Sequence, residues 1–134
     1  MGRDELPMPT DAELAILRVL WSRGPCTVRD VHEALEAQGT GYTTALKLMQ
    51  IMAAKGLVTR DESSRSHVYA AVPTEEKTQR RLLRELMDKA FSGSAAELVQ
   101  RALSVKLASR EDLAAIREML DEAGAGAAGK GKKR

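Results

Sequence analysis

The amino-acid sequence predicts a mostly α-helical chain that carries one small β-hairpin. Apolar residues recur at helical spacing along most of the 134 residues, and the period changes from about 3.6 to about 2 only after Gly56. Aromatic residues make up 3% of the chain, which favours helices that pack through aliphatic side chains. A chain of this length holds one sizeable core and an appended module, which argues against a large enzyme.

Two helices are expected in the first third of the chain. Thr10 and Glu13 form a capping-box pattern ahead of an apolar face, which predicts a helix over residues 11–23. Thr27 is placed to cap a second helix that ends near Gln38, before two glycines that allow a tight turn.

A third helix and a hairpin follow. The helix runs from about Tyr42 to Lys55, and Gly56 is suited to the left-handed conformation that closes a helix. Residues 57–62 and 67–72 form two short strand patterns around a polar turn. Three helices joined by short turns make a helix-turn-helix core, so the hairpin beside them predicts a winged helix-turn-helix domain.

A second, smaller module is expected after Pro73, because proline cannot continue a strand ladder. Three helical patterns follow, and each begins at a residue suited to cap a helix, namely Thr74, Ser94 and Ser109. The last pattern stops at Gly124, and the low-complexity remainder predicts disorder. The sequence therefore predicts a winged helix-turn-helix domain at 1–73, a helical dimerisation domain at 74–124 and a disordered basic tail at 125–134.

The helices of the second module carry apolar faces that need a partner. A unit of about 50 residues buries too little surface alone to be comfortably stable, and a second copy of the chain is the economical partner. A three-helix dimerisation region is therefore expected. Its dimerisation residues are predicted to be Leu82, Leu83, Leu86, Met87, Phe91, Leu98, Val99, Leu103, Leu113, Ile116 and Leu120.

The third helix presents a mixed polar face opposite its apolar one. Glutamine can pair with an adenine edge, lysine with guanine or a phosphate, threonine with either, and an aliphatic side chain with a thymine methyl group. The alternative is an ordinary solvated helix face. The exposed isoleucine Ile51 disfavours this alternative, because a solvated polar face gains nothing from it. The DNA-binding residues expected on this helix are Tyr42, Thr43, Thr44, Lys47, Gln50 and Ile51.

Two arginines of the hairpin complete the expected DNA-binding set. Arg65 lies at the tip and Arg60 flanks it, where guanidinium groups suit phosphates or a minor groove. The alternative for Arg60 is a pair with Glu62 that keeps an exposed edge soluble. His67 is expected to begin a strand, and Tyr69 is expected to pack inside the wing.

Charge is distributed unevenly along the first domain. Residues 42–72 carry four basic and two acidic side chains, whereas residues 1–41 carry four basic and seven acidic ones. Positive charge is thus concentrated where DNA would dock. The four basic residues of the tail supply the net positive charge of the chain, and a solvated tail or weak nonspecific DNA affinity is expected of them.

Other function classes find little support in the sequence. Cys26 is the single cysteine and is expected to be a buried structural thiol, which excludes an intramolecular disulfide and a cysteine-built metal site within one chain. Neither His32 nor His67 has a local carboxylate or cysteine constellation, so no enzyme, metal or cofactor is expected. No apolar run approaches the roughly 20 residues of a membrane span and no signal-peptide core is present, so a cytoplasmic protein is expected.

Four stretches of the chain form one combined pattern: LPMPTDAELAILRVLWSRGPCTVRDVHEAL, GYTTALKLMQIMAAKGLVTR, HVYAAV and KAFSGSAAELVQRAL. The pattern resembles the penicillinase-repressor (BlaI/MecI/CopY) family of bacterial winged-helix regulators over about residues 6–122. The resemblance implies a homodimer that represses transcription from a palindromic operator, with N-terminal winged helices on the DNA and C-terminal helices making the dimer. It also implies that Thr43, Thr44 and Lys47 contact bases or phosphates, with Arg65 in the wing.

The chain departs from the family pattern at three places. Ile51 stands where relatives often carry a basic residue and Ala53-Ala54 where they are often charged, which implies weaker phosphate contact or a different operator. Arg101-Ala102 stands where β-lactam-responsive members carry the Asn-Phe bond that is cleaved, which disfavours a membrane sensor protease as inactivator. The paired C-terminal cysteines of copper-responsive relatives are absent, which disfavours copper sensing.

The leading hypothesis is a homodimeric transcriptional repressor that reads a palindromic operator with a helix at about 42–55 and a wing at 57–72. The alternative is a winged-helix adaptor that binds other proteins without sequence-specific DNA binding, which the modest charge bias would tolerate. Salt-dependent, sequence-selective binding to a palindrome discriminates the two.

Overall fold

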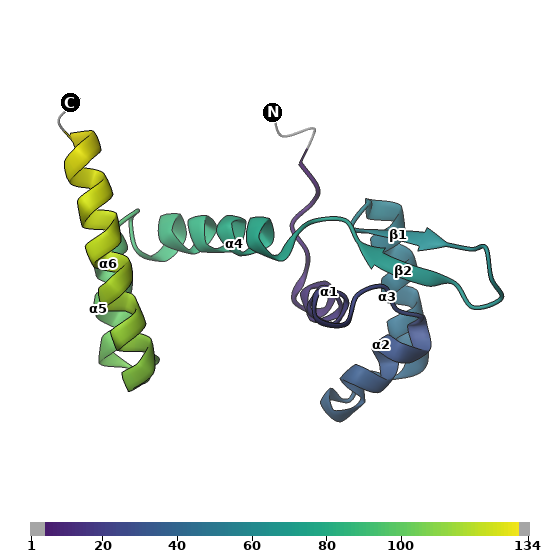
Figure 1. Ribbon diagram of the computed structural model, residues 1–134. Helices are drawn as coiled ribbons and strands as arrows, with labels where there is room; N and C mark the ends of the chain where they lie inside the picture. The colour runs from purple at the N-terminus through teal and green to yellow at the C-terminus, as the bar shows by residue number, and fades with distance from the viewer. Residues whose placement is uncertain (1–4, 132–134) are drawn as a thin grey trace. The chain divides into compact units, whose positions relative to one another are not determined.

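The computed structural model describes residues 5–131, with side chains up to residue 126. The chain divides into two compact units, one that ends at Leu82 and one that begins at Leu83. Six α-helices and one two-stranded antiparallel sheet make up the described part of the chain (Figure 1). The predicted fold class, mostly helical with a small β-wing, is confirmed.

Three helices open the first unit: α1 (Asp11–Arg23), α2 (Val28–Leu35) and α3 (Tyr42–Lys55). The start of α1 is fixed by the predicted capping box, in which the Thr10 hydroxyl accepts from Glu13 N at 3.2 Å and the Glu13 carboxylate accepts from Thr10 N at 3.0 Å. Thr27 and Asp30 form the same reciprocal pair at the start of α2. The predicted second helix continues beyond α2 as one 3-10 turn over Glu36–Gln38.

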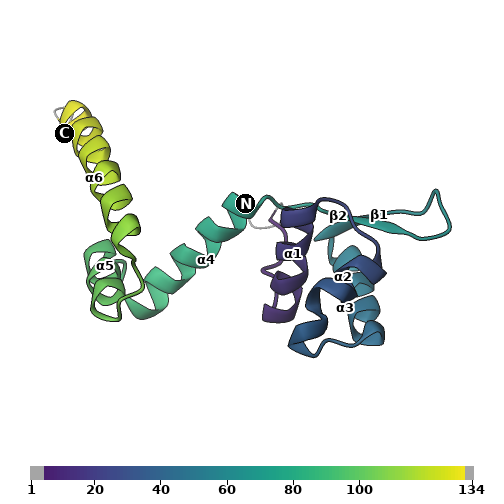
Figure 2. The same cartoon turned by 60° about the horizontal axis from the view of Figure 1, so that its bottom comes forward.

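The predicted hairpin consists of β1 (Val58–Asp61) and β2 (Val68–Ala71). The strands pair antiparallel with Val58 opposite Ala71, and Figure 2 shows their loop projecting away from the three helices. A third segment joins the sheet, because Cys26 and Tyr69 exchange both backbone hydrogen bonds, at 2.9 and 2.7 Å. The wing is therefore tied to the chain segment that leads into α2.

One apolar core holds the helices and the wing of the first unit together. The side chains that are 0% exposed come from α1, α2, α3 and the segment before β1, and Tyr69 of β2 is only 1% exposed. The predicted buried face of α3 is confirmed by Ala45, Met49 and Met52. At the end of this helix Gly56 adopts the predicted left-handed conformation, with φ of 87°.

Cys26 is a buried packing residue, as predicted. The residue is 4% exposed, and its thiol donates a hydrogen bond to Gly24 O at 3.2 Å. Burial, helped by the nearby charge of Asp30, raises the pKa of this thiol. Because the thiolate is the reactive form, the raised pKa makes Cys26 a poor nucleophile.

A carboxylate lies within the first unit between α1 and α3. Glu13 is 2% exposed, and Lys55 Nζ lies 2.6 Å from its Oε2. Burial alone would raise the pKa of this carboxyl, but hydrogen bonds from Lys55 and from the Thr10 backbone, together with the Lys55 charge, outweigh burial and lower the pKa. The ion pair joins the last turn of α3 to the first turn of α1.

Replacing Lys55 with methionine is expected to destabilise the protein by about 1–2 kcal/mol near pH 7, because Glu13 loses its partner while Lys55 itself is one-third exposed. The loss should shrink on acidification. A carboxyl with a lowered folded pKa adds stability above its unfolded pKa of about 4.3, and that stability disappears as the pH falls through the folded pKa. Urea unfolding near pH 7 and near pH 4, followed by Trp21 fluorescence, measures both losses.

Lys47→Met, on the exposed face of the same helix, is the control for this substitution and should change stability by no more than about 0.5 kcal/mol. Equal losses for Lys55→Met at the two pH values would contradict a role for the Glu13 charge.

The fourth helix, α4, spans Glu75–Ala90. It begins at the predicted cap, since the Thr74 hydroxyl accepts from Lys77 N at 3.1 Å. Within the first unit, the Arg81 guanidinium donates to Leu6 O at 2.7 Å. The early part of α4 is thus fastened to the N-terminal segment.

The compact units divide inside α4 rather than after Pro73. The indole N–H of Trp21 donates to Pro73 O at 3.0 Å, which holds the start of α4 against α1. This contact joins residues far apart in the sequence. The break in sequence pattern at residue 73 therefore does not coincide with the division between the two compact units. The roles assigned to residues 1–73 and 74–124 stay predictions.

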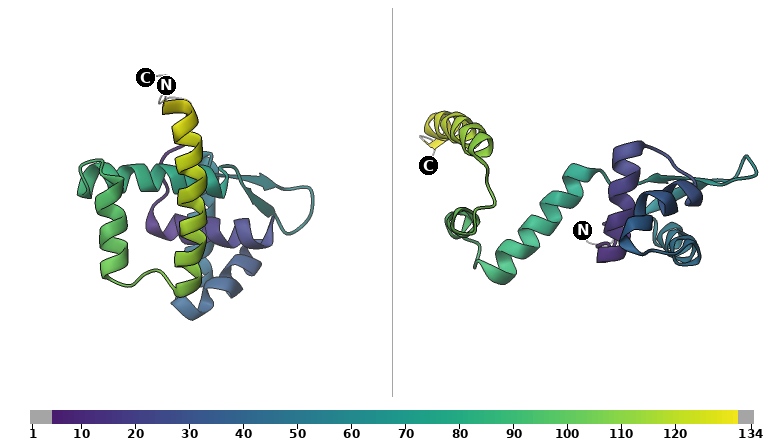
Figure 3. Two further views of the ribbon diagram at one scale, coloured as in Figure 1. Left: turned by 60° about the vertical axis from the view of Figure 1, so that its left-hand side comes forward. Right: turned by 90° about the horizontal axis from the view of Figure 1, so that it is seen from below.

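The second unit contains α5 (Ala95–Ser104) and α6 (Arg110–Gly131). The predicted cap at Ser109 is confirmed by a reciprocal pair of hydrogen bonds with Asp112, each of 3.0 Å. Figure 3 shows α5 and α6 as separate helices joined by a short connection. None of the helices over residues 5–131 combines the length and the hydropathy of a membrane-spanning segment.

The predicted helix stop at Gly124 is wrong. The helix α6 continues to Gly131, so the predicted disorder of the tail is wrong for residues 125–131, while residues 132–134 lie outside the described part of the chain. Extending an existing helix costs far less than nucleating one, and this stretch contains alanines and no proline that would interrupt it.

Candidate nucleic-acid interface

The outward face of α3 carries the side chains predicted to read DNA. All six predicted residues of this helix are exposed, including Tyr42 at 47% and Ile51 at 39%. The opposite face is buried in the core, so the helix is held rigidly while this face stays free. The exposed set is Tyr42, Thr43, Thr44, Lys47, Gln50 and Ile51.

The start of α3 is suited to negatively charged groups. Gly41 occupies the cap position without a side-chain hydrogen bond, and the first turn contains no acidic residue. The backbone N–H groups there therefore lack a side-chain acceptor, and the helix dipole adds partial positive charge at this end. A DNA phosphate is an anion that such an end accommodates.

A hollow of about 390 Å³ lies where α3, the start of α2 and the wing meet. It brings together four of the predicted residues, Tyr42, Gln50, Arg60 and Arg65, from two separate elements. The other lining residues are Thr27, Val28, Arg29, Leu46, Ser66, His67 and Tyr69. The hollow therefore unites the helix and the wing in one polar surface that includes three arginines.

Arg29 is a candidate contact that the sequence did not indicate. It is the second residue of α2, it is exposed, and no acidic side chain is paired with it among residues 5–126. A cation in the first turn of a helix is opposed by the helix dipole. This unfavourable placement is the one signal in the sequence that could have indicated Arg29 as an anion-binding residue. An external anion at this position would offset that opposition.

Arg60 is already engaged by its neighbours. Its guanidinium lies 2.6 Å from the Glu62 carboxylate, and hydrogen bonds to the Tyr69 side chain and to Glu62 raise its pKa. The ion pair weighed as the alternative for this residue is therefore present. Arg65 lies in the exposed loop between the strands, and no ion pair to it occurs within the part of the chain whose side chains are described.

The loop of the wing is ordered by short-range hydrogen bonds. Ser63 N donates to Asp61 Oδ1 at 2.9 Å, which lowers the pKa of that carboxyl, and the Ser64 hydroxyl donates to Ser66 O at 2.8 Å. Asp61 and Glu62 match the two arginines of the hairpin in number. The two arginines of the hairpin therefore give it no net positive charge.

Ion pairing also changes which basic side chains of residues 42–72 are available to a ligand. Lys55 is held by Glu13 and Arg60 by Glu62, whereas Lys47 has no ion pair among the described side chains. The sequence count of four basic residues thus reduces to two available cations on this segment, Lys47 and Arg65, and Arg29 adds a third from α2.

His32 of α2 packs against the first residue of α3. The rings of His32 and Tyr42 meet edge to face, with centroids 5.7 Å apart and an interplanar angle of 78°. This contact restrains the Tyr42 ring, which lines the hollow. His67, also in the lining, immediately precedes β2, whereas the sequence predicts that it begins the strand.

The residues predicted to make a dimer are poorly covered within one chain. Among the residues from Leu83 to Gly126, none is fully buried. Leu83, Leu86, Val99 and Leu103 are 46–49% exposed, and Leu120 is 64% exposed. The partly exposed members are Leu82, Met87, Phe91, Leu98 and Ile116, with Leu113 at 38%.

Similar proteins include two transcriptional regulators named BlaI, from two strains of Mycobacterium tuberculosis. Each is 47% identical to this chain over 64 residues, which is 46% of this chain and 46% of the relative. The chain thus spans about half the length of the curated relatives it matches.

Two solved structures are also similar. The solution structure of the DNA-binding domain of the repressor BlaI is 22% identical, with a TM-score of 0.48, and covers 53% of this chain and 88% of that one. The crystal structure of the transcriptional regulator Tm0710 from Thermotoga maritima is 19% identical, with a TM-score of 0.49, and covers 93% and 80%.

The family described as penicillinase repressor matches this chain over residues 9–122. The match includes the capped helices of the first unit, the hairpin, α5 and the part of α6 up to residue 122. It therefore extends over most of the chain rather than over one motif. The chain belongs to the penicillinase repressor family.

Proposed function

We propose that this protein is a DNA-binding transcriptional repressor that acts as a homodimer on a palindromic operator. The observation that carries the proposal is the continuous exposed surface formed by α3 and the hollow beside it. Membership of a repressor family supports it. The name of the BlaI relatives, transcriptional regulator, agrees with the same role.

The exposed face of α3 is the part proposed to read bases in a major groove. Gln50 suits the adenine edge, Lys47 suits guanine or a phosphate, and Ile51 suits a thymine methyl group. The buried opposite face holds the helix against α1 and α2, so these side chains approach DNA as a fixed set. A rigid set of contacts favours discrimination between sequences.

The hollow is proposed to hold the DNA backbone beside that groove. Arg29 and Arg65 lie on separate elements and have no acidic partner among the described side chains. Guanidinium groups bind phosphate oxygens with good geometry. Arg60 would contribute only after it exchanges Glu62 for a phosphate.

The second unit is proposed to join two copies of the chain. Its apolar side chains remain largely exposed in one copy, which is costly unless a partner covers them. A two-fold dimer would place two winged domains on the two halves of a palindrome.

Lys47→Ala is expected to weaken operator binding about tenfold and to lower the salt slope of the affinity by about two in a dimer, one per copy, because each copy loses one cationic contact. Fluorescence anisotropy at several salt concentrations measures both quantities. The DNA is a palindromic fragment selected from the source genome with the unaltered protein.

Lys77→Ala serves as the matched control, because Lys77 is an exposed lysine of α4 outside the proposed interface. Its affinity and salt slope should match those of the unaltered protein. Unchanged affinity in Lys47→Ala would place Lys47 outside the interface. Absence of DNA binding even at low salt would contradict the repressor proposal. The alternative hypothesis, an adaptor that binds other proteins, would then remain.

A further inference from the structure

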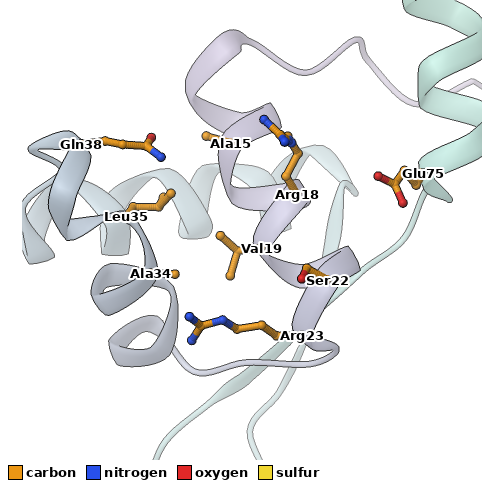
Figure 4. Close-up of a pocket in the computed structure, with 9 residues that line it drawn as sticks. All are labelled: Ala15, Arg18, Val19, Ser22, Arg23, Ala34, Leu35, Gln38 and Glu75. Carbon is orange, nitrogen blue, oxygen red and sulfur yellow. The ribbon is translucent and has the colours of Figure 1, made fainter. Parts of the chain in front are cut away.

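A second hollow lies between α1 and α2. Its volume is about 550 Å³, within the range typical of small-molecule sites. None of its lining residues lines the hollow beside the wing. The lining residues, drawn in Figure 4, are Ala15, Arg18, Val19, Ser22, Arg23, Ala34, Leu35, Gln38 and Glu75.

The middle of this hollow is apolar. Val19 projects from α1 toward Ala34 and Leu35 of α2 in Figure 4. Leu35 is 4% exposed and belongs to the core, so this part of the wall is fixed. The apolar surface open to a ligand comes from Val19 and Ala34, which are partly exposed, and covering them would remove it from water.

A guanidinium group lies at each end of the apolar middle. Figure 4 shows Arg18 and Arg23 on opposite sides of Val19, and their positions on α1 are five residues apart, about 7.5 Å along a helix. Both arginines are exposed, and neither has an ion pair among the side chains of residues 5–126. The hydroxyl of Ser22 and the amide of Gln38 add hydrogen-bonding groups to the lining.

We propose that this hollow is a binding site for a small organic dianion, with a carboxylate on Arg18, a carboxylate on Arg23 and an aliphatic middle on Val19 and Ala34. Arginine binds carboxylates through paired N–H groups, which gives such a ligand a defined orientation. Glu75 supplies an acidic group at the edge of the hollow, and its charge opposes the ligand. The site is separate from the proposed DNA contacts and does not depend on them.

Adipate is the probe, because it places two carboxylates at the ends of a short aliphatic chain. Titration of the full-length protein, followed by amide chemical shifts, should show saturable changes at the lining residues with a Kd in about the millimolar range. Hexanoate has the same carbon chain with one carboxylate and should bind about tenfold more weakly.

Three substitutions test the charge arrangement. Arg18→Gln and Arg23→Gln should each weaken adipate binding about tenfold, and Glu75→Gln should strengthen it. Arg110→Gln, on exposed α6, is the control and should leave adipate binding unchanged. Because both arginines of the hollow are exposed, the variants should keep the unfolding curve of the unaltered protein, and this is measured first.

Three outcomes would overturn the proposal: no saturable shifts at the lining residues up to about 20 mM adipate, equal affinity for hexanoate and adipate, or unchanged affinity in either arginine variant. A folded Arg18→Gln variant that binds adipate like the unaltered protein would be decisive against a two-ended site.

Discussion

A protein shortened to end at Leu82 is expected to be a folded monomer that binds the proposed palindromic DNA about 10²–10⁴ times more weakly than the full chain. The shortened chain keeps the helix, wing and hollow proposed to contact one half-site. It lacks the exposed apolar helices proposed to link two copies. Without that link the second half-site is no longer bound at a high effective concentration, and the gain from bivalency disappears.

The position of the cut matters, because the first unit extends into α4. Arg81 donates to the backbone of Leu6, and the Trp21 indole donates to Pro73. Ending the chain before Thr74 would remove the first of these contacts and disturb the second. Ending it at Leu82 retains both, so weak DNA binding by this protein would not arise from a damaged winged domain.

Analytical ultracentrifugation and anisotropy on the same samples test this expectation. A matched variant of the full chain, Leu103→Asp, places a charge on an apolar side chain of α5 that is 47% exposed. It should also dissociate and lose affinity while the first unit stays intact. A shortened protein that still sediments as a dimer would show that the second unit is not the dimerisation region.

Tyr69→Ala is expected to destabilise the first unit by about 3–5 kcal/mol, which approaches the whole stability of a small domain. Tyr69 is 1% exposed and is among the largest fully buried side chains. Its removal leaves a cavity between the wing and the helices. The backbone pairing with Cys26 would then have less packing around it.

Urea unfolding followed by the single tryptophan, Trp21, measures this loss. Tyr69→Phe is the matched control, because it keeps the ring and removes only the hydroxyl that interacts with Arg60. It should cost about 1 kcal/mol. A loss for Tyr69→Ala no larger than that of Tyr69→Phe would mean that the ring does not anchor the wing.

Local sequence signals were sufficient for the elements of the first unit. The capping box of Thr10 and Glu13 marks the start of α1, and Gly24 follows its last residue, so both ends match the prediction. Gly56 marks the end of α3 in the same way. Each signal depends on residues a few positions apart, which is the range that a single sequence reports well.

Contacts between distant residues were not predictable from one sequence. The ion pair of Glu13 and Lys55 joins α1 to α3. Because of this pair, Lys55 is not available to bind a DNA phosphate, although the sequence alone counts it among the basic residues of the domain. The backbone pairing of Cys26 with Tyr69 adds a third segment to the wing without any strand pattern around Cys26. Arg29 belongs to the hollow only because α2 and the wing converge there.

The extension of α6 shows the opposite limit of local reasoning. Glycines at the end of a helical pattern usually predict its end, and Gly124 therefore predicts that the last helix stops there. In the structure the helix continues through it, because each intrahelical hydrogen bond formed beyond it adds to an existing helix. The low-complexity composition of residues 125–131 therefore did not determine whether their backbone is helical.

The short helix α2 has a consequence for how binding to this protein is measured. Its first turn, with Arg29, lines the hollow beside the wing, and its last turn, with Leu35, lines the hollow that faces α1. Eight residues span only about 12 Å, so one rigid rod borders both cavities. If an occupant of one cavity shifts that rod, each ligand must alter the affinity of the other by the same factor. Citrate or succinate in a buffer would then act as a second ligand in a DNA titration. Operator affinities should therefore be compared only in buffers that contain the same anion at the same concentration.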